Sequence, residues 1–173
     1  HIASQHIADL LTVIVPRHAA RGDAIAADLR ARGFTLVQRS KHEMLQPDTA
    51  IYLADTMGEL GLFYRHATLV FMGGSLIAHG GQNPLEPARL GNCLLTGPHT
   101  HNFAAMVAAL ATLGGAQVVA DTAALAQAVC TLLAEAETRT RMATAAAAWV
   151  AQQGGASGPI LAEIAQRLPQ EAA

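Results

Sequence analysis

Residues 68–90, which read TLVFMGGSLIAHGGQNPLEPARL, decide the fold. The segment opens with the apolar run 68–72, a pattern typical of a buried strand. Glycines follow at once, and the stretch 73–83 is too irregular to continue a strand or to form a helix. Pro84 suits the first turn of a helix, and Gly91 suits the position just after its end. A strand, a glycine-rich loop and a helix in this order are the unit from which parallel sheets are built.

The same alternation of short apolar runs and longer helical patterns continues along the chain. Strands are expected at 10–15, 34–38, 51–53, 68–72, 93–95 and 118–119. Helices are expected at 19–32, 60–64 and 84–90, from 102 onward before the last strand, and at 123–135, 142–152 and 160–168. Gly33 suits the C-terminal cap of the helix at 19–32. Asp55 or Thr56 is expected to cap the helix that follows them. The pattern predicts a single α/β domain over residues 1–173, with a doubly wound, Rossmann-like parallel sheet.

Composition narrows the class of protein. The 173 residues are 51% hydrophobic and 14% charged, which indicates a compact globular chain. A net charge of −2 does not indicate the basic surface that a nucleic-acid-binding domain carries. The apolar runs are shorter than the ~20 residues that a membrane-spanning helix needs. Cys93 and Cys130 lack CxxC spacing, so we expect a reduced, cytoplasmic setting.

Polar and glycine residues gather directly after four of the predicted strands, where α/β sheets bind ligands. The four groups are PRH at 16–18, DTMGE at 55–59, the loop and helix start at 73–86, and GPHTHNF at 97–103. The glycines of the third group allow a ligand to approach the backbone closely. The helix start at Asn83 offers unpaired amides to an anion.

Several of these side chains have two interpretations. Glu86 lies three residues after Asn83, so it either completes a capping box or accepts hydrogen bonds from ribose hydroxyls. Arg17 is either solvated or bound to a phosphate or carboxylate in bidentate fashion. Glu59 either compensates a helix dipole or contacts the ligand. Met57 and Gly58 provide the apolar side chain and exposed amide that a flat pyrimidine base requires.

The histidines do not predict a metal site. His79, His99 and His101 lie in the loops, but the sequence has no HExxH motif and no clustered carboxylates or thiolates. We expect His79 and His99 to orient loops or to donate to a phosphate or sugar carboxylate. Ser75 follows a glycine, but Ile77 fills the second glycine position of GxSxG, so hydrolase chemistry is disfavoured.

Three runs together resemble the signature of 3-deoxy-D-manno-octulosonic acid (Kdo) transferases. They are FMGGSL at 71–76, HGGQNPLEP at 79–87, and GPH with NF at 97–99 and 102–103. The runs VPRH at 15–18, RS at 39–40 and DTMGEL at 55–60 match the same family in the same order. The resemblance covers nearly the whole chain. Gln82, His42 and His101 lie at positions to which we assign no role.

The resemblance implies a glycosyltransferase of the B type, in which two Rossmann-like domains face a cleft and the C-terminal one holds the nucleotide donor. This chain would be that C-terminal domain, without the N-terminal acceptor domain. The implied CMP-binding residues are Pro16, Arg17, Met57, Gly58, Glu59, Asn83, Pro84, Leu85 and Glu86. The residues implied to contact the donor sugar or to orient loops are Gly74, Ser75, His79, Gly80, Gly81, His99 and Asn102.

The reaction implied by the resemblance is an inverting, metal-independent transfer of Kdo from CMP-Kdo to a lipid A precursor in lipopolysaccharide biosynthesis. It needs no cofactor and takes place at the cytoplasmic face of the bacterial inner membrane. The general base is a glutamate of the N-terminal domain, which also binds the lipid acceptor and carries the membrane anchor. No segment of this sequence matches that domain. We therefore expect a soluble chain, without a catalytic residue, that binds CMP or CMP-Kdo but does not catalyse transfer alone.

The residues alone are also compatible with two other functions. One is a UDP-sugar transferase or epimerase of the same fold, which would share the phosphate and ribose contacts. The other is a non-enzymatic interaction domain whose Ala-rich C-terminal helices form the working surface. A dinucleotide-binding domain is disfavoured, because no GxGxxG follows the first predicted strand.

Overall fold

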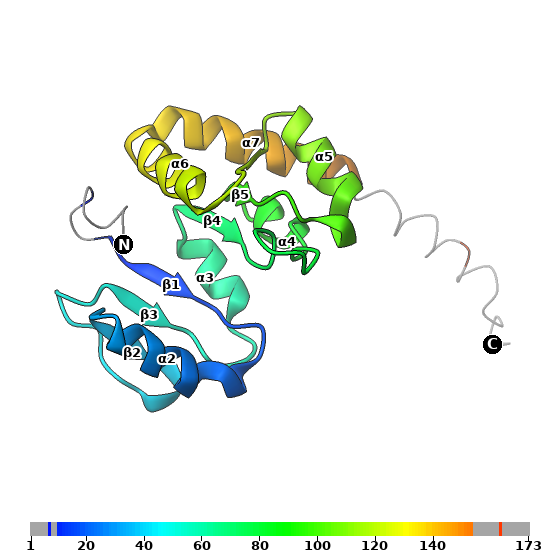
Figure 1. Ribbon diagram of the computed structural model, residues 1–173. Helices are drawn as coiled ribbons and strands as arrows, with labels where there is room; N and C mark the ends of the chain where they lie inside the picture. The colour runs from blue at the N-terminus through cyan, green and yellow to red at the C-terminus, as the bar shows by residue number, and fades with distance from the viewer. Residues whose placement is uncertain (1–6, 8–9, 154–162, 164–173) are drawn as a thin grey trace, which may run out of the picture.

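The structure is a computed structural model that describes residue 7, residues 10–153 and residue 163. Its strands are β1 Thr12–Ile14, β2 Leu36–Gln38, β3 Ile51–Leu53, β4 Leu69–Met72, β5 Cys93–Thr96 and β6 Ala116–Val118. Its α-helices are α2 Gly22–Ala31, α3 Leu60–His66, α4 Leu85–Arg89, α5 Ala104–Thr112, α6 Thr122–Ala134 and α7 Ala136–Gln153. Short 3₁₀ turns form η1 Ala19–Arg21, η2 Arg39–Lys41 and η3 His101–Phe103. The parallel α/β architecture predicted from the sequence is confirmed (Figure 1).

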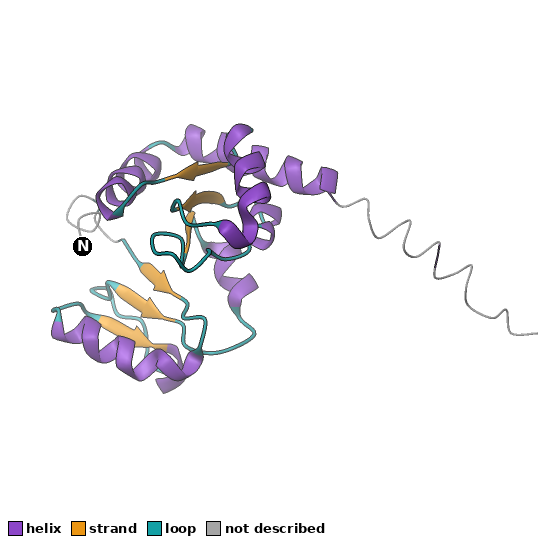
Figure 2. Ribbon diagram, turned by 45° about the vertical axis from the view of Figure 1, so that its right-hand side comes forward, coloured by secondary structure: helices purple, strands orange, loops and turns teal. Residues whose placement is uncertain are grey.

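The strands lie in two three-stranded parallel sheets, in the orders β1-β3-β2 and β4-β5-β6. The sequence predicted a doubly wound parallel sheet, and within the described residues its strands form two sheets, in which β1 pairs with β3 and β4 pairs with β5. Figures 1 and 2 show the two sheets as separate layers joined through α3. All strands of a sheet run the same way, so the loops after their carboxyl ends leave from one edge.

Helix boundaries follow local chemistry. The helix expected at 19–32 is split into η1 and α2, and Gly33 ends it with a φ of 83°, the left-handed conformation of a C-terminal cap. The cap predicted for α3 is wrong. Glu59 occupies that position, because the Asp55 carboxylate is bonded elsewhere. Asp121 caps α6 by accepting a hydrogen bond of 2.8 Å from the Ala124 amide.

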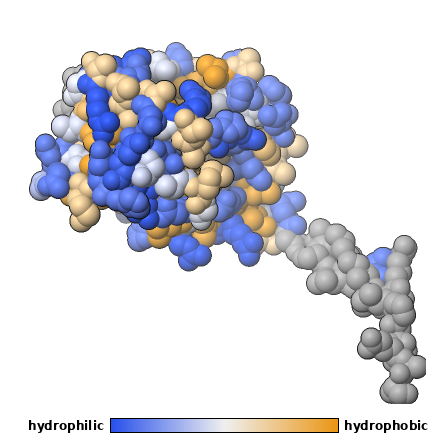
Figure 3. All heavy atoms as spheres, turned by 90° about the horizontal axis from the view of Figure 1, so that it is seen from below, coloured by the Kyte–Doolittle hydropathy of each residue, from blue (hydrophilic) through white to orange (hydrophobic). Residues whose placement is uncertain are grey.

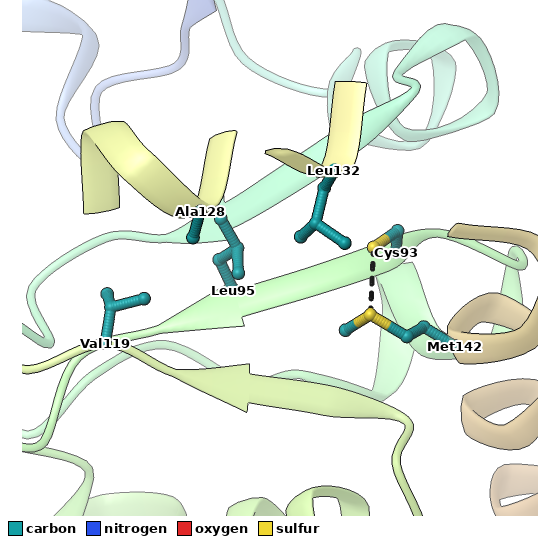
Figure 4. Packing of buried hydrophobic residues seen from close by; sticks show 6 residues of the cluster. All are labelled: Cys93, Leu95, Val119, Ala128, Leu132 and Met142. Atoms are coloured by element: carbon teal, nitrogen blue, oxygen red, sulfur yellow. Dashed lines mark hydrogen bonds between the residues drawn. The ribbon is translucent and has the colours of Figure 1, made fainter. Parts of the chain in front are cut away.

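The larger part of the core lies between the second sheet and helices α6 and α7. Figure 4 shows Cys93 and Leu95 of β5 facing Leu132 of α6 and Met142 of α7. The Cys93 Sγ and Met142 Sδ atoms are 3.6 Å apart. Burial raises the pKa of the Cys93 thiol to about 11. This thiol is therefore a packing group rather than a reactive one.

The C-terminal elements differ from prediction mainly in their ends. Helix α7 begins at Ala136, ahead of the expected 142, and β6 ends at Val118. The helix expected at 160–168 lies outside the described residues apart from Glu163. Within the described part of the chain, no helix is both long and apolar enough to cross a membrane. Figure 3 shows one face of the molecule, on which hydrophilic side chains predominate.

Candidate functional site

The loop after β1 carries Pro16 and Arg17 and reaches the glycine-rich loop after β4. The Arg17 guanidinium donates from Nη1 to Oε1 of Gln82 at 3.1 Å. This contact joins a loop of the first sheet to a loop of the second. Arg17 is exposed, so further donors of its guanidinium face solvent.

The loop between β3 and α3 holds Glu59 in an ion pair. Arg39 of η2 donates to the Glu59 carboxylate from Nε at 3.1 Å and from Nη2 at 2.7 Å. The Thr56 hydroxyl donates to the same carboxylate. The hydrogen bond from Arg39, together with that from Thr56, lowers the pKa of Glu59 to about 2. Glu59 is therefore a bound, ionised acceptor rather than a solvated residue at a helix start.

Met57 and Gly58 form the outward side of this loop. Met57 is 75% exposed, and Gly58 has a φ of 88°. That left-handed backbone conformation suits glycine and turns the peptide outward. An exposed thioether beside an open backbone provides a surface on which a flat ring could lie.

The glycine-rich loop after β4 is anchored by a serine. Ser75 is fully buried, and its hydroxyl donates to the Met72 carbonyl and accepts from the Gly97 amide at 2.7 Å. The Gly81 amide donates to the Gly74 carbonyl at 3.1 Å and closes the loop on itself. Ser75 therefore holds the loop in place, because both bonds of its buried hydroxyl go to backbone groups.

The loop after β5 packs against the same segment. Gly80 has a φ of 92°, and a Cβ placed on it would lie 2.2 Å from Nδ2 of Asn102. The Asn102 amide donates to the Gly80 carbonyl at 3.3 Å, and the His99 amide donates to the Ser75 carbonyl at 2.9 Å. Asn102 thus orients the loop, while the side chains of His79 and His99 are exposed.

Helix α4 begins at the end of the glycine-rich loop and is five residues long. Asn83 Oδ1 accepts a hydrogen bond of 3.0 Å from the Leu85 amide, and Pro84 is buried at the helix start. Glu86 is exposed, and within the described residues no hydrogen bond or ion pair occupies its carboxylate. The Asn83 bond reaches the amide two residues on rather than three, and Pro84 holds the N-cap position, so the capping box is not formed.

A pocket of about 370 Å³ adjoins the Glu86 carboxylate. It is lined by Asn83, Leu85, Glu86, Arg89, Val150 and Gln153. A Cβ on Gly61, in the first turn of α3, would lie 3.4 Å from Oε1 of Glu86, so α3 and α4 meet here. Burial raises the pKa of the nearby Tyr64 phenol, and the charge of Glu86 raises it further.

Two hydrogen bonds link three of the four sequence-predicted groups: Arg17 bonds to Gln82, and the Asn102 amide bonds to the Gly80 carbonyl. The second group, at 55–59, lies next to them through the first turn of α3, where Gly61 is beside Glu86. Sequence reasoning assigned no role to Arg39, Gln82 or Asp55 in a site. The sequence did contain a signal for Arg39. This residue directly follows β2, just as the four predicted groups directly follow their strands. Among the described residues, no three His, Cys, Asp or Glu side chains are grouped so as to hold a metal ion.

Parallel strands whose carboxyl-end loops converge on one site define a Rossmann-like domain of the ligand-binding α/β class. No family model matches the chain. A 3-deoxy-D-manno-octulosonic acid transferase of Haemophilus influenzae is 41% identical over 138 residues, which are 79% of this chain and 32% of that protein. The corresponding transferase of Bordetella pertussis is 35% identical over 148 residues, 85% of this chain and 35% of that protein.

A solved structure extends the likeness to three dimensions. The C-terminal CMP-Kdo binding domain of WaaA from Acinetobacter baumannii matches with a TM-score of 0.78 and 31% identity, over 83% of this chain and 74% of that chain. The chain belongs to the 3-deoxy-D-manno-octulosonic acid transferase family, whose members are glycosyltransferases. It spans about a third of the length of the curated relatives it matches.

Proposed function

We propose that this chain binds CMP-Kdo as the donor-binding part of an inverting, metal-independent Kdo transferase of lipopolysaccharide biosynthesis. The observation that carries the proposal is the Glu86 carboxylate, which is exposed, uncommitted among the described residues and beside a pocket. The loops carrying Arg17 and Glu59 are held next to the same helix start. Family membership and the match to a CMP-Kdo binding domain support the choice of ligand.

Each group has a role in the proposed complex. Glu86 accepts hydrogen bonds from the ribose hydroxyls, and Arg17 contacts the phosphate. Met57 and Gly58 lie against the cytosine ring, with Glu59 beside them. His79 and His99, whose side chains are exposed, are the candidates to reach the carboxylate of the sugar. No metal or other cofactor takes part.

The acceptor side of the reaction is also part of the proposal. An N-terminal domain would bind the lipid A precursor and would contain the general base. No segment of this sequence matches that domain. That domain would provide the contact with the cytoplasmic face of the bacterial inner membrane. The chain alone is then expected to bind nucleotide without transferring Kdo, and transfer by the purified chain would contradict this.

Calorimetric titration of the chain with CMP, UMP and UDP tests the proposal. CMP should bind most tightly, because the proposed site recognises the cytosine base. Glu86→Ala should weaken CMP binding by on the order of 1–3 kcal/mol, the range for hydrogen bonds to a charged group. Glu137→Ala removes an exposed carboxylate from the first turn of α7 and is the matched control.

The competing functions give different results in the same titration. A UDP-sugar enzyme of this fold would prefer UDP or UMP over CMP. An interaction domain would bind none of the three nucleotides and would self-associate in solution. An unchanged CMP affinity in Glu86→Ala would remove Glu86 from the site.

A further inference from the structure

Asp55 is buried at the end of β3, with 5% of its surface exposed. Its Oδ1 accepts a hydrogen bond of 2.9 Å from the Ser40 amide. Its Oδ2 accepts one of 2.7 Å from the Ser40 hydroxyl and one of 2.7 Å from Nε2 of Gln38. Burial acts to raise the pKa of this carboxyl, and the bonds from Gln38 and Ser40 outweigh it, so the pKa lies below its ordinary value. Asp55 is therefore an ionised carboxylate with three donors.

The backbone of α2 encloses the same carboxylate from another side. A Cβ placed on Gly22 would lie 2.1 Å from Oδ2 of Asp55. Gly22 has a φ of −51°, which any residue adopts, so the requirement for glycine is one of space. The carboxylate is consequently confined to one position between β2, β3 and α2.

Two segments of the candidate site are attached to this carboxylate. One is the turn η2, in which Ser40 directly follows Arg39. The other is the loop 56–59, which directly follows Asp55 and ends at Glu59. The ion pair between Arg39 and Glu59 closes the link, with side chains 41% and 27% exposed. A bidentate pair of this kind tolerates little misalignment, because two parallel hydrogen bonds must form together.

We propose that Asp55 is a positioning residue of the donor site. Its carboxylate holds the Arg39 turn against the Glu59 loop, so that the two side chains form one ion pair and face the ligand in a fixed orientation. The part of this inference that concerns the ligand rests on the proposed function. The part that concerns the ion pair does not.

The ion pair is tested without ligand by NMR of the Arg39 Nε–H group, assigned by its loss in Arg39→Gln. In the wild-type chain this proton should be shifted and slow to exchange, because it is bonded to Glu59. In Asp55→Asn the signal should move to the position of a free arginine and exchange at least about tenfold faster, since the turn is released. An unchanged signal in a folded Asp55→Asn protein would overturn the proposal.

The ligand effect is tested by calorimetry with CMP. Asp55→Asn should weaken binding about tenfold. Because Asp55 acts through Arg39, the double variant Asp55→Asn with Arg39→Gln should lose no more affinity than Arg39→Gln alone. Additive losses would overturn the proposal, since they would mean that Asp55 acts independently of the ion pair. Leu132→Ala, which destabilises the distant core under α6, is the control and should leave CMP affinity unchanged.

A second variant keeps the test decisive if Asp55→Asn fails to fold. Ser40→Ala removes the hydroxyl bond to Asp55 and the weaker 3.3 Å bond that the hydroxyl accepts from Gln38. It retains the Asp55 charge and the backbone bond from Ser40, so it should produce a smaller change of the Arg39 signal in the same direction. No change in that variant would count against the proposal. If the wild-type chain does not bind CMP, the proposed function fails, while the NMR measurement still decides the role of Asp55.

Discussion

At the scale of single residues, Glu59 is the clearest case of a side chain whose environment fixes its charge. Its pKa is lowered to about 2 from an ordinary 4.5 by the bonds from Arg39 and Thr56. A lowered pKa in the folded state means that this group stabilises the fold above about pH 4.5. The contribution is lost as the pH falls from there toward 2.

The first prediction follows from that shift. A carboxyl-carbon NMR titration should place the midpoint of Glu59 near 2, and Arg39→Gln should move it upward toward 4.5. The Thr56 bond remains in the variant, so the return should be incomplete. A wild-type midpoint near 4.5 would show that the ion pair does not form in solution.

Cys93 gives a second prediction at the same scale. With its pKa raised to about 11 by burial, roughly one thiol in a thousand is ionised at pH 8. In a Cys130→Ser variant, the remaining thiol should react with a disulfide reagent only slowly in the folded chain, and at the ordinary rate after unfolding in guanidinium. Fast reaction in the folded protein would contradict the packing in Figure 4.

At the scale of elements, the glycine-rich loop and η3 depend on each other at Gly80. Gly80→Ala should destabilise the fold by more than the ~1 kcal/mol that a side chain in the left-handed region costs. The excess arises because its Cβ would collide with Asn102. Gly114→Ala is the matched control, since Gly114 has a φ of 71° but nothing within 4 Å of its Cβ. Equal decreases in melting temperature for Gly80→Ala and Gly114→Ala would show that the collision with Asn102 adds nothing to the destabilisation.

Elements were also the scale at which the sequence was most informative. The strand at 51–53 and the end of α2 at Gly33 were predicted correctly, because a short apolar run and a cap glycine are local signals. The cap of α3 was mispredicted, because the Asp55 side chain is engaged by Gln38 and Ser40, partners 15 or more residues away. Arg39 was missed for the same reason, since its role depends on a contact across 20 positions.

At the scale of the whole molecule, the division into two sheets could not be read from the sequence. A strand pattern reports which segments are extended but not which edges meet, and β1 and β4 end as separate edges. The candidate site nevertheless draws on both sheets. Arg17 and Glu59 follow strands of the first, whereas Gln82 and Glu86 follow a strand of the second.

A site shared in this way should couple the two sheets when it is occupied. At a CMP concentration of 100 times Kd, ligand binding stabilises a folded protein by about 2.7 kcal/mol. Hydrogen exchange followed by mass spectrometry should then show added protection in peptides from β3 as well as from β5, because nucleotide release must precede the opening of either sheet. In Arg17→Ala the protection of β3 should fall more than that of β5, since one of the contacts between the sheets is lost. Protection confined to β5 would mean that the nucleotide is held by the second sheet alone, and that the loops after β1 and β3 take no part in binding it.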